Sequence, residues 1–121
     1  MNIYCIVDTN NNITTLFGGP QNPPTPTGYT VMDDTDSRYA AYLTAQQWQA
    51  YQTQARIALD KTDITVNRVA EGVAVGTCAW TNADVVAYMN YRRSLRAILT
   101  EAQPATIPTS LPTPAPFPAG T

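Results

Sequence analysis

The sequence contains no histidine and a single lysine, Lys61, among its 121 residues. Histidine is the commonest general base and the commonest metal ligand, so its absence removes the usual starting point for both kinds of site. The two cysteines, Cys5 and Cys78, are too few and too far apart to predict a zinc site. Each lies in an apolar run, which favours buried free thiols over a disulfide between them. We therefore expect no metal, no cofactor and no enzymatic activity.

Charged residues and long apolar runs are also scarce. Only 13% of the residues are charged and the formal net charge is −2, which gives no electrostatic reason to expect nucleic acid or an anionic membrane as a partner. No stretch is long enough to span a bilayer. The first four residues lack the basic and apolar segments of a signal peptide, so we expect a protein that is made and used in the cytoplasm or that leaves by a route other than secretion.

Two segments have the composition of ligand-binding loops but lack the residues that such loops need. Gly18-Gly19 is followed by a proline and not by the start of a helix, so it does not predict a phosphate-binding loop. Asp33, Asp34 and Asp36 lie close together, but neither the central glycine nor the distal glutamate of a calcium-binding loop follows them. The sequence predicts a solvated acidic turn there.

Proline, in contrast, is abundant: the sequence has ten, gathered in two places. The first cluster lies within residues 20–28. The second lies in residues 104–121, where a proline every two to four positions favours an extended polyproline conformation. Such a segment leaves its backbone polar groups available to a partner and loses little entropy on binding. It cannot fold on itself, so we expect it either to be loose or to be held by something else.

The first third of the chain predicts strands. Residues 2–8 alternate between two faces and are rich in β-forming side chains. An asparagine-rich turn at 8–12 leads into a second strand over 13–17, and a third is expected over 29–32. We therefore predict a small antiparallel β-meander with a proline-rich loop over residues 1–43. The side chains expected on one face of the first strand are those of Ile3, Cys5 and Val7.

Two further segments predict helices. Thr44 is a good N-cap, and Gln47 three residues later completes a capping box. Thr62 is predicted to cap a second, short helix that Gly72 ends. The apolar face of the first helix, which we expect to pack in the core, consists of Trp48, Tyr51, Ala55 and Leu59.

The last helix is predicted to begin at Thr81 or Asn82, with Asp84 placed to favour its positive end. Together these elements give an α+β fold: a small N-terminal antiparallel β-meander, two or three helices and an extended proline-rich C-terminal arm. The helical region covers residues 44–103 and the arm covers residues 104–121.

The arginines of the last helix have two possible roles. Arg92 and Arg96 are four positions apart and share a face, whereas Arg93 points elsewhere. They either form bidentate contacts with carboxylates or carbonyls of a partner, or they solvate the helix and pair within the chain. The residues alone leave both roles open. The carboxylates considered for internal pairs are Asp60, Asp63 and Glu71.

Three segments, in this order, resemble the motifs of one family. Residues 58–73, with an aspartate, a threonine and an arginine on a short helix, are similar to its central motif. Residues 91–98 resemble the motif that follows, and residues 111–114 with 116–121 resemble its terminal proline signature. The family is the tail-fibre assembly proteins of tailed bacteriophages. The resemblance covers the chain from residue 55 or so to its end, and the first 50 or so match only in kind.

The resemblance implies a protein that binds a phage tail fibre, expected to be trimeric, or a neighbouring tail or baseplate protein. Some such proteins are chaperones that cover apolar or unpaired surface until the fibre trimerises, and others stay on the particle. The chain would then act in the host cytoplasm during assembly or in the virion tail.

The resemblance also implies binding without catalysis. The helix with Arg92 and Arg96 would dock on the fibre, the arm would lie along it, and Trp48, Trp80 and Tyr88 would pack the core between them. The residues implied in partner binding are Tyr91, Arg92, Arg96, Leu111, Pro112, Pro114, Pro116, Phe117 and Pro118.

A second class of function is a virion structural component that is not associated with fibres, such as a tail, baseplate or head accessory subunit. The arm would then bind a subunit lattice. Gene position distinguishes the two classes, because a fibre assembly protein should be encoded beside a long, β-rich fibre gene.

Overall fold

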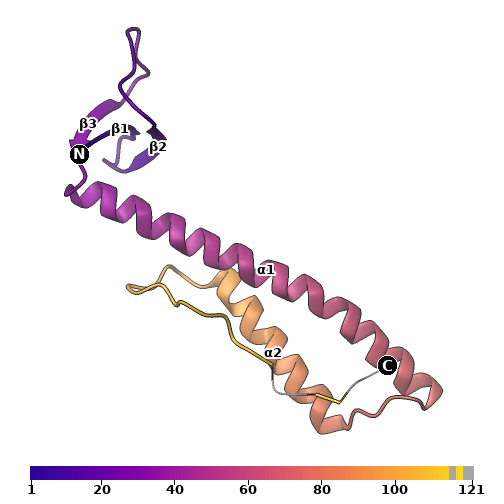
Figure 1. The fold of residues 1–121 in the computed structure, drawn as a ribbon. Coiled ribbons are helices and arrows are strands. Elements are labelled where there is room, and N and C mark those ends of the chain that lie inside the picture. The colour runs from indigo at the N-terminus through magenta and orange to yellow at the C-terminus, as the bar shows by residue number, and fades with distance from the viewer. Residues whose placement is uncertain (115–116, 119–121) are drawn as a thin grey trace. The chain divides into compact units, whose positions relative to one another are not determined.

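The structure is a computed structural model, which describes residues 1–114 and 117–118. Its elements are β1 (Asn2–Val7), β2 (Ile13–Phe17), β3 (Tyr29–Asp33), α1 (Ser37–Val75) and α2 (Asn82–Thr100) (Figure 1). Two compact units, Met1–Trp48 and Gln49–Thr121, divide the chain, and α1 continues through their boundary. Within the described residues the fold is α+β, with one three-stranded antiparallel sheet and two helices, as predicted.

The central strand of the sheet is β1, which pairs antiparallel with β2 on one side and with β3 on the other. The order β2-β1-β3 corrects the predicted meander, in which β3 would lie beside β2. The long proline-containing loop after β2 carries the chain to the far side of β1, where the Val7 amide donates to the Gly28 carbonyl at 2.9 Å. Gly28 has a φ of +85°, and a Cβ there would lie 2.4 Å from the Val7 carbonyl oxygen. Only glycine therefore permits this close approach.

One face of the sheet forms the core of the first unit. Ile3 and Cys5 of β1 are buried, so the alternation predicted for this strand is confirmed. Burial also raises the pKa of the Cys5 thiol. Side chains from the first turns of α1, Tyr39 and Tyr42, pack against this core. Its other members are Val7, Ile13, Leu16 and Met32.

The start of α1 lies at Ser37 and not at Thr44. Asp36 caps it, because its Oδ1 accepts the Arg38 amide at 2.9 Å and its Oδ2 accepts from the Arg38 guanidinium at 2.9 Å. The same guanidinium also donates from Nη1 to Oδ1 of Asn11 at 2.9 Å, in the turn after β1. The hydroxyl of Thr44 donates to a carbonyl one turn earlier, inside the helix. The capping pattern at Thr44 is unused because the acidic residue before Ser37 already supplies the cap.

The second predicted helix is part of α1, which runs unbroken for 39 residues to Val75. Thr62 therefore lies inside the helix, and Gly72 does not end it. No proline or glycine occurs between Ser37 and Gly72, so nothing in the backbone interrupts the helix.

The helix ends in a glycine-dependent motif one turn beyond the predicted position. Gly76 has a φ of +76°; its amide donates to the Val73 carbonyl at 3.3 Å and that of Thr77 donates to the Gly72 carbonyl at 2.9 Å. This is the Schellman pattern. Gly72 has a different role: a Cβ there would lie 2.9 Å from the Cβ of Cys78, where the chain turns back past the helix.

In the second unit, α2 returns alongside the second half of α1, and the arm runs back along α2 (Figure 1). Thr81 caps α2 as predicted, and its hydroxyl accepts the Asp84 amide at 3.2 Å while Oδ2 of Asp84 accepts the Thr81 amide at 2.9 Å. The buried residues of α2 are Tyr88, Leu95 and Ile98. Those on the facing side of α1 are Tyr51, Ala55, Thr62 and Val69.

We predict that Gly76→Ala lowers the free energy of unfolding by about 1–2 kcal/mol, because a Cβ disfavours the left-handed conformation. No atom lies within 4 Å of the added Cβ, so the effect isolates backbone strain. Gly76→Asn should cost less, since asparagine tolerates this conformation. Urea unfolding followed by the helical circular dichroism signal measures the change. The control is Gly18→Ala, also in open space but without a positive φ; equal effects of the two alanine variants would contradict the assignment.

The cap of α1 predicts a specific acid dependence. The side-chain hydrogen bond from Arg38 lowers the pKa of Asp36 from 3.8 to about 2. Because the folded-state pKa is the lower one, the stabilisation is complete above pH 4 or so and is lost as the pH falls toward about 2. Asp36→Asn should therefore flatten the dependence of unfolding free energy on pH in this window. Urea unfolding at a series of pH values measures it, with the exposed Asp60→Asn as control; an unchanged slope in Asp36→Asn would refute the cap's role.

Candidate partner-binding site

The guanidinium of Arg92 is tied to α1 through two of its nitrogens. Its Nε donates to Oγ1 of Thr62 at 2.8 Å, and its Nη2 donates to Oδ1 of Asp63 at 2.6 Å. The Arg92 side chain is only 12% exposed, whereas that of Asp63 is 60% exposed. Of the two roles that the sequence left open, the structure therefore shows internal pairing for Arg92, with Asp63 as the partner.

The position of Thr62 explains why it does not begin a helix. Thr62 is 4% exposed, and its hydroxyl donates to the Leu59 carbonyl and accepts from Nε of Arg92. A buried hydroxyl needs such partners, because an unsatisfied polar group in the interior costs about 1–3 kcal/mol. The threonine hydroxyl is thus used inside α1 and across to α2.

The neighbouring residues of α2 lie in different surroundings. Arg96, one turn after Arg92, is exposed, as is Arg93. Neither forms an ion pair with a described residue. Tyr91 is half-buried, and burial raises the pKa of its hydroxyl. Of the two arginines predicted to bind a partner, Arg96 is the one whose guanidinium is accessible.

Four aromatic rings gather where α2 begins. The rings of Trp80 and Phe117 are stacked, with centroids 4.7 Å apart and planes 8° apart. Tyr88 meets both edge-on, at 5.3 Å from Trp80 and 5.2 Å from Phe117. Tyr91 extends the group, with its ring 5.8 Å from that of Tyr88. Stacked and edge-to-face pairs at these distances are favourable beyond their burial of apolar surface.

The arm is held by α1 and by residues at the start of α2. Nε1 of Trp80 donates to the Pro118 carbonyl at 2.8 Å, and the Tyr51 hydroxyl donates to the Ser110 carbonyl at 3.1 Å. Leu111 and Pro112 are half-buried, whereas Pro114 and Pro118 are exposed. Pro116 lies outside the described residues. The sequence predicted an arm that is loose or held, and the structure places it in contact with α1 and α2.

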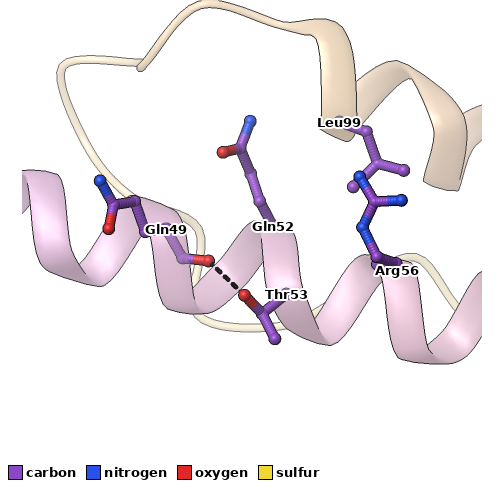
Figure 2. A pocket seen from close by; sticks show the side chains of 5 residues that line it. All are labelled: Gln49, Gln52, Thr53, Arg56 and Leu99. Carbon is purple, nitrogen blue, oxygen red and sulfur yellow. Dashed lines mark hydrogen bonds between the residues drawn. The ribbon is translucent and has the colours of Figure 1, made fainter.

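A groove opens between α1 and the last turn of α2. Its volume is about 320 Å³, and Figure 2 shows the five side chains that line it: Gln49, Gln52, Thr53, Arg56 and Leu99. Gln52 reaches across to donate from its Nε2 to the Ile98 carbonyl at 3.0 Å. The Thr53 hydroxyl donates to the Gln49 carbonyl at 2.9 Å. Guanidinium and amide donors in an open groove suit recognition of carbonyls or carboxylates.

The part of the chain that the structure describes contains neither a metal-binding cluster nor a membrane-spanning helix. No group of three or more histidine, cysteine, aspartate or glutamate side chains there is placed to hold a metal ion. None of the helices in that part is both long and apolar enough to cross a membrane. Cys5 and Cys78 are free thiols; Cys5 is buried, as expected, whereas Cys78 is half-buried.

Comparisons of the chain with family models, with curated proteins and with solved structures found no match.

Sequence reasoning did not identify the contact between Trp80 and Phe117 or the groove around Arg56. Phe117 is the single aromatic residue of an otherwise small and proline-rich arm, which is a signal that it needs an apolar partner. Trp80 directly precedes the cap of α2, so its side chain lies at the end of the helix pair. No local pattern links two residues so far apart in the chain.

We predict that Arg92→Ala lowers the free energy of unfolding by about 1.5–3 kcal/mol, because it removes hydrogen bonds to a charged group and leaves Thr62 buried with fewer partners. Arg96→Ala is the matched control, and as an exposed substitution it should change stability by less than about 0.5 kcal/mol. Urea unfolding of both variants measures the difference. Equal, small effects would show that the Arg92 contacts contribute nothing to stability.

Proposed function

We propose that this chain binds a phage tail fibre and either assists its assembly or remains attached to it. The support comes from where the three family-like segments lie. The central segment and the one that follows it meet at the contacts of Arg92 with Thr62 and Asp63. The proline segment packs at the start of α2, where Phe117 and Pro118 contact Trp80 and Phe117 also contacts Tyr88. Segments far apart in sequence thus form one structural unit, as expected of motifs that specify a common fold.

The outer side of α1 offers a surface for such a partner. Ile57 and Ile64 are 50% and 59% exposed, and their spacing of one heptad places them on the same side of the helix. The residues at the buried positions of α1 lie on the opposite side. A fibre chain that has not yet trimerised exposes apolar surface and unpaired strand edges, against which these two exposed isoleucines can pack.

The test is co-expression of the full chain with the long, β-rich fibre protein encoded nearest to it. We expect the two to co-purify, and quantitative mass spectrometry of virions then separates the two roles within the proposal. Absence from particles identifies a chaperone, and a fixed ratio to the fibre identifies an attached subunit. A fixed ratio to other particle proteins, without any association with the fibre, would reject the proposal in favour of an accessory subunit.

Arg96 provides a prediction about the interface. Arg96→Ala should weaken fibre binding by about 1 kcal/mol, or roughly fivefold, because one accessible charge-assisted contact is lost. Arg93→Ala removes the same charge from another side of α2 and serves as the matched control. Isothermal titration calorimetry with the fibre protein measures both. If the two variants weaken binding equally, the effect is one of overall charge and Arg96 has no specific contact.

A further inference from the structure

Trp80 and Tyr88 form a site that we call the aromatic cradle, and its occupant is the chain's own Phe117. The Phe117 ring lies flat on the indole of Trp80 and edge-on to Tyr88. Trp80 and Tyr88 also line a cavity of only about 20 Å³ together with apolar side chains. This cavity is too small for a ligand, so the surface of the cradle that can bind one is the surface that Phe117 covers. The other lining residues are Val66, Val69, Val85 and Met89.

The cradle also carries one polar anchor. Nε1 of Trp80 donates to the carbonyl of Pro118, the residue after the stacked ring. Proline has no amide proton, so its carbonyl is the only backbone group that it offers for recognition. An aromatic surface with such a donor beside it is the arrangement by which proteins recognise extended, proline-rich segments. The cradle is thus matched to an extended segment in which an aromatic residue precedes a proline.

The described part of the arm has few hydrogen bonds and ring contacts with the rest of the chain. Across residues 104–114 and 117–118, the described hydrogen bonds to the arm come from Tyr51 of α1 and from Trp80, which lies just before α2. Most of the described arm residues are exposed. One of these bonds is exposed and the other is part-buried. A segment held in this way opens at a lower free energy than the helices beside it. The half-buried members of the arm are Pro104, Ile107, Leu111, Pro112 and Phe117.

We propose that the aromatic cradle is a binding site for an extended aromatic–proline segment of a partner protein, and that Phe117–Pro118 covers it as an intramolecular competitor. The docked arm is the observation that defines the ligand, because it shows which chemistry the cradle accepts. A tethered segment acts at an effective concentration of about millimolar, so the arm excludes weak ligands. It yields to a partner segment that binds more tightly or that is held by further contacts. The cradle's ligand class and its regulation by the arm do not depend on whether the partner is a fibre.

The test uses the full chain and a fluorescent peptide with the sequence of residues 104–121. Phe117→Ala removes the competing ring, so this variant should bind the peptide at least tenfold more tightly than the wild-type chain does. A peptide that carries alanine at the position of Phe117 should lose this binding. In the Phe117→Ala chain, the additional change Trp80→Phe keeps an aromatic ring but removes the donor, and it should weaken peptide binding by about fivefold. Thr113→Ala, an exposed change in the arm, is the control and should behave as wild type.

Two further measurements decide the outcome. The indole N–H resonance of Trp80 should shift in Phe117→Ala and return when the peptide is added, while the circular dichroism spectrum stays constant.

Sedimentation should show the same oligomeric state for wild type and Phe117→Ala. If peptide affinity or the indole resonance is the same in both chains, the arm does not cover the cradle and the proposal is wrong. A wild-type oligomer that Phe117→Ala dissociates would also overturn it, because the occupant would then be the arm of a second copy. Failure here would leave co-purification with a fibre untouched, so the two proposals are tested separately.

Discussion

The contacts of Arg92 with Thr62 and Asp63 determine how the second unit is built. A guanidinium with little solvent exposure needs hydrogen-bond partners, and here two consecutive residues of α1 supply them. A planar fork that contacts two adjacent side chains restricts both the rotation of α2 about its axis and its position along α1. Tyr88 lies one turn before Arg92 on the same side of α2. Its place beside Trp80, and with it the aromatic cradle, therefore follows from the position of Arg92.

The same contacts decide which groups are available to a partner. Because Arg92 is used inside the chain, the accessible cations of the second unit include Arg93 and Arg96 on α2 and Arg56 in the groove of Figure 2. The apolar residues Ile57 and Ile64 lie on the other side of α1 from its buried side chains. The unit thus combines a buried arginine that maintains its structure with exposed groups that are free to bind. A residue type that recurs in a motif can serve either purpose, and burial is what separates them.

The sequence predicted correctly those elements that depend on residues close together in the chain. The alternation of β1, the asparagine turn after it and the capping box at Thr81 and Asp84 all depend on residues within a few positions of one another, and all are present. The predictions at Thr44 and Thr62 failed, because a threonine hydroxyl can cap a helix or bond within it, and more distant groups decide between the two. At Thr62 the deciding group is Arg92, which is 30 residues away.

The errors at Gly72 and in the strand order also arise from distant parts of the chain. Gly72 suggested a helix end, but it is required because Cys78 passes close to it. Likewise, the position of β3 depends on where the loop ending at Gly28 meets Val7, which no pattern within the strands reveals. Among the candidate site residues, the sequence indicated that the arm needs a binding surface. It could not show that this surface includes Trp80 of the same chain, because the contact joins residues 37 or more positions apart.

The most direct test of the account is amide hydrogen exchange of the full chain, alone and in complex with the fibre protein, read by mass spectrometry. We predict that the arm is partly protected in the free chain and exchanges faster in the complex as it leaves the cradle, and that protection persists or increases around Trp80 and Tyr88. Unchanged exchange in the arm and around the cradle, with new protection confined to other regions, would contradict it.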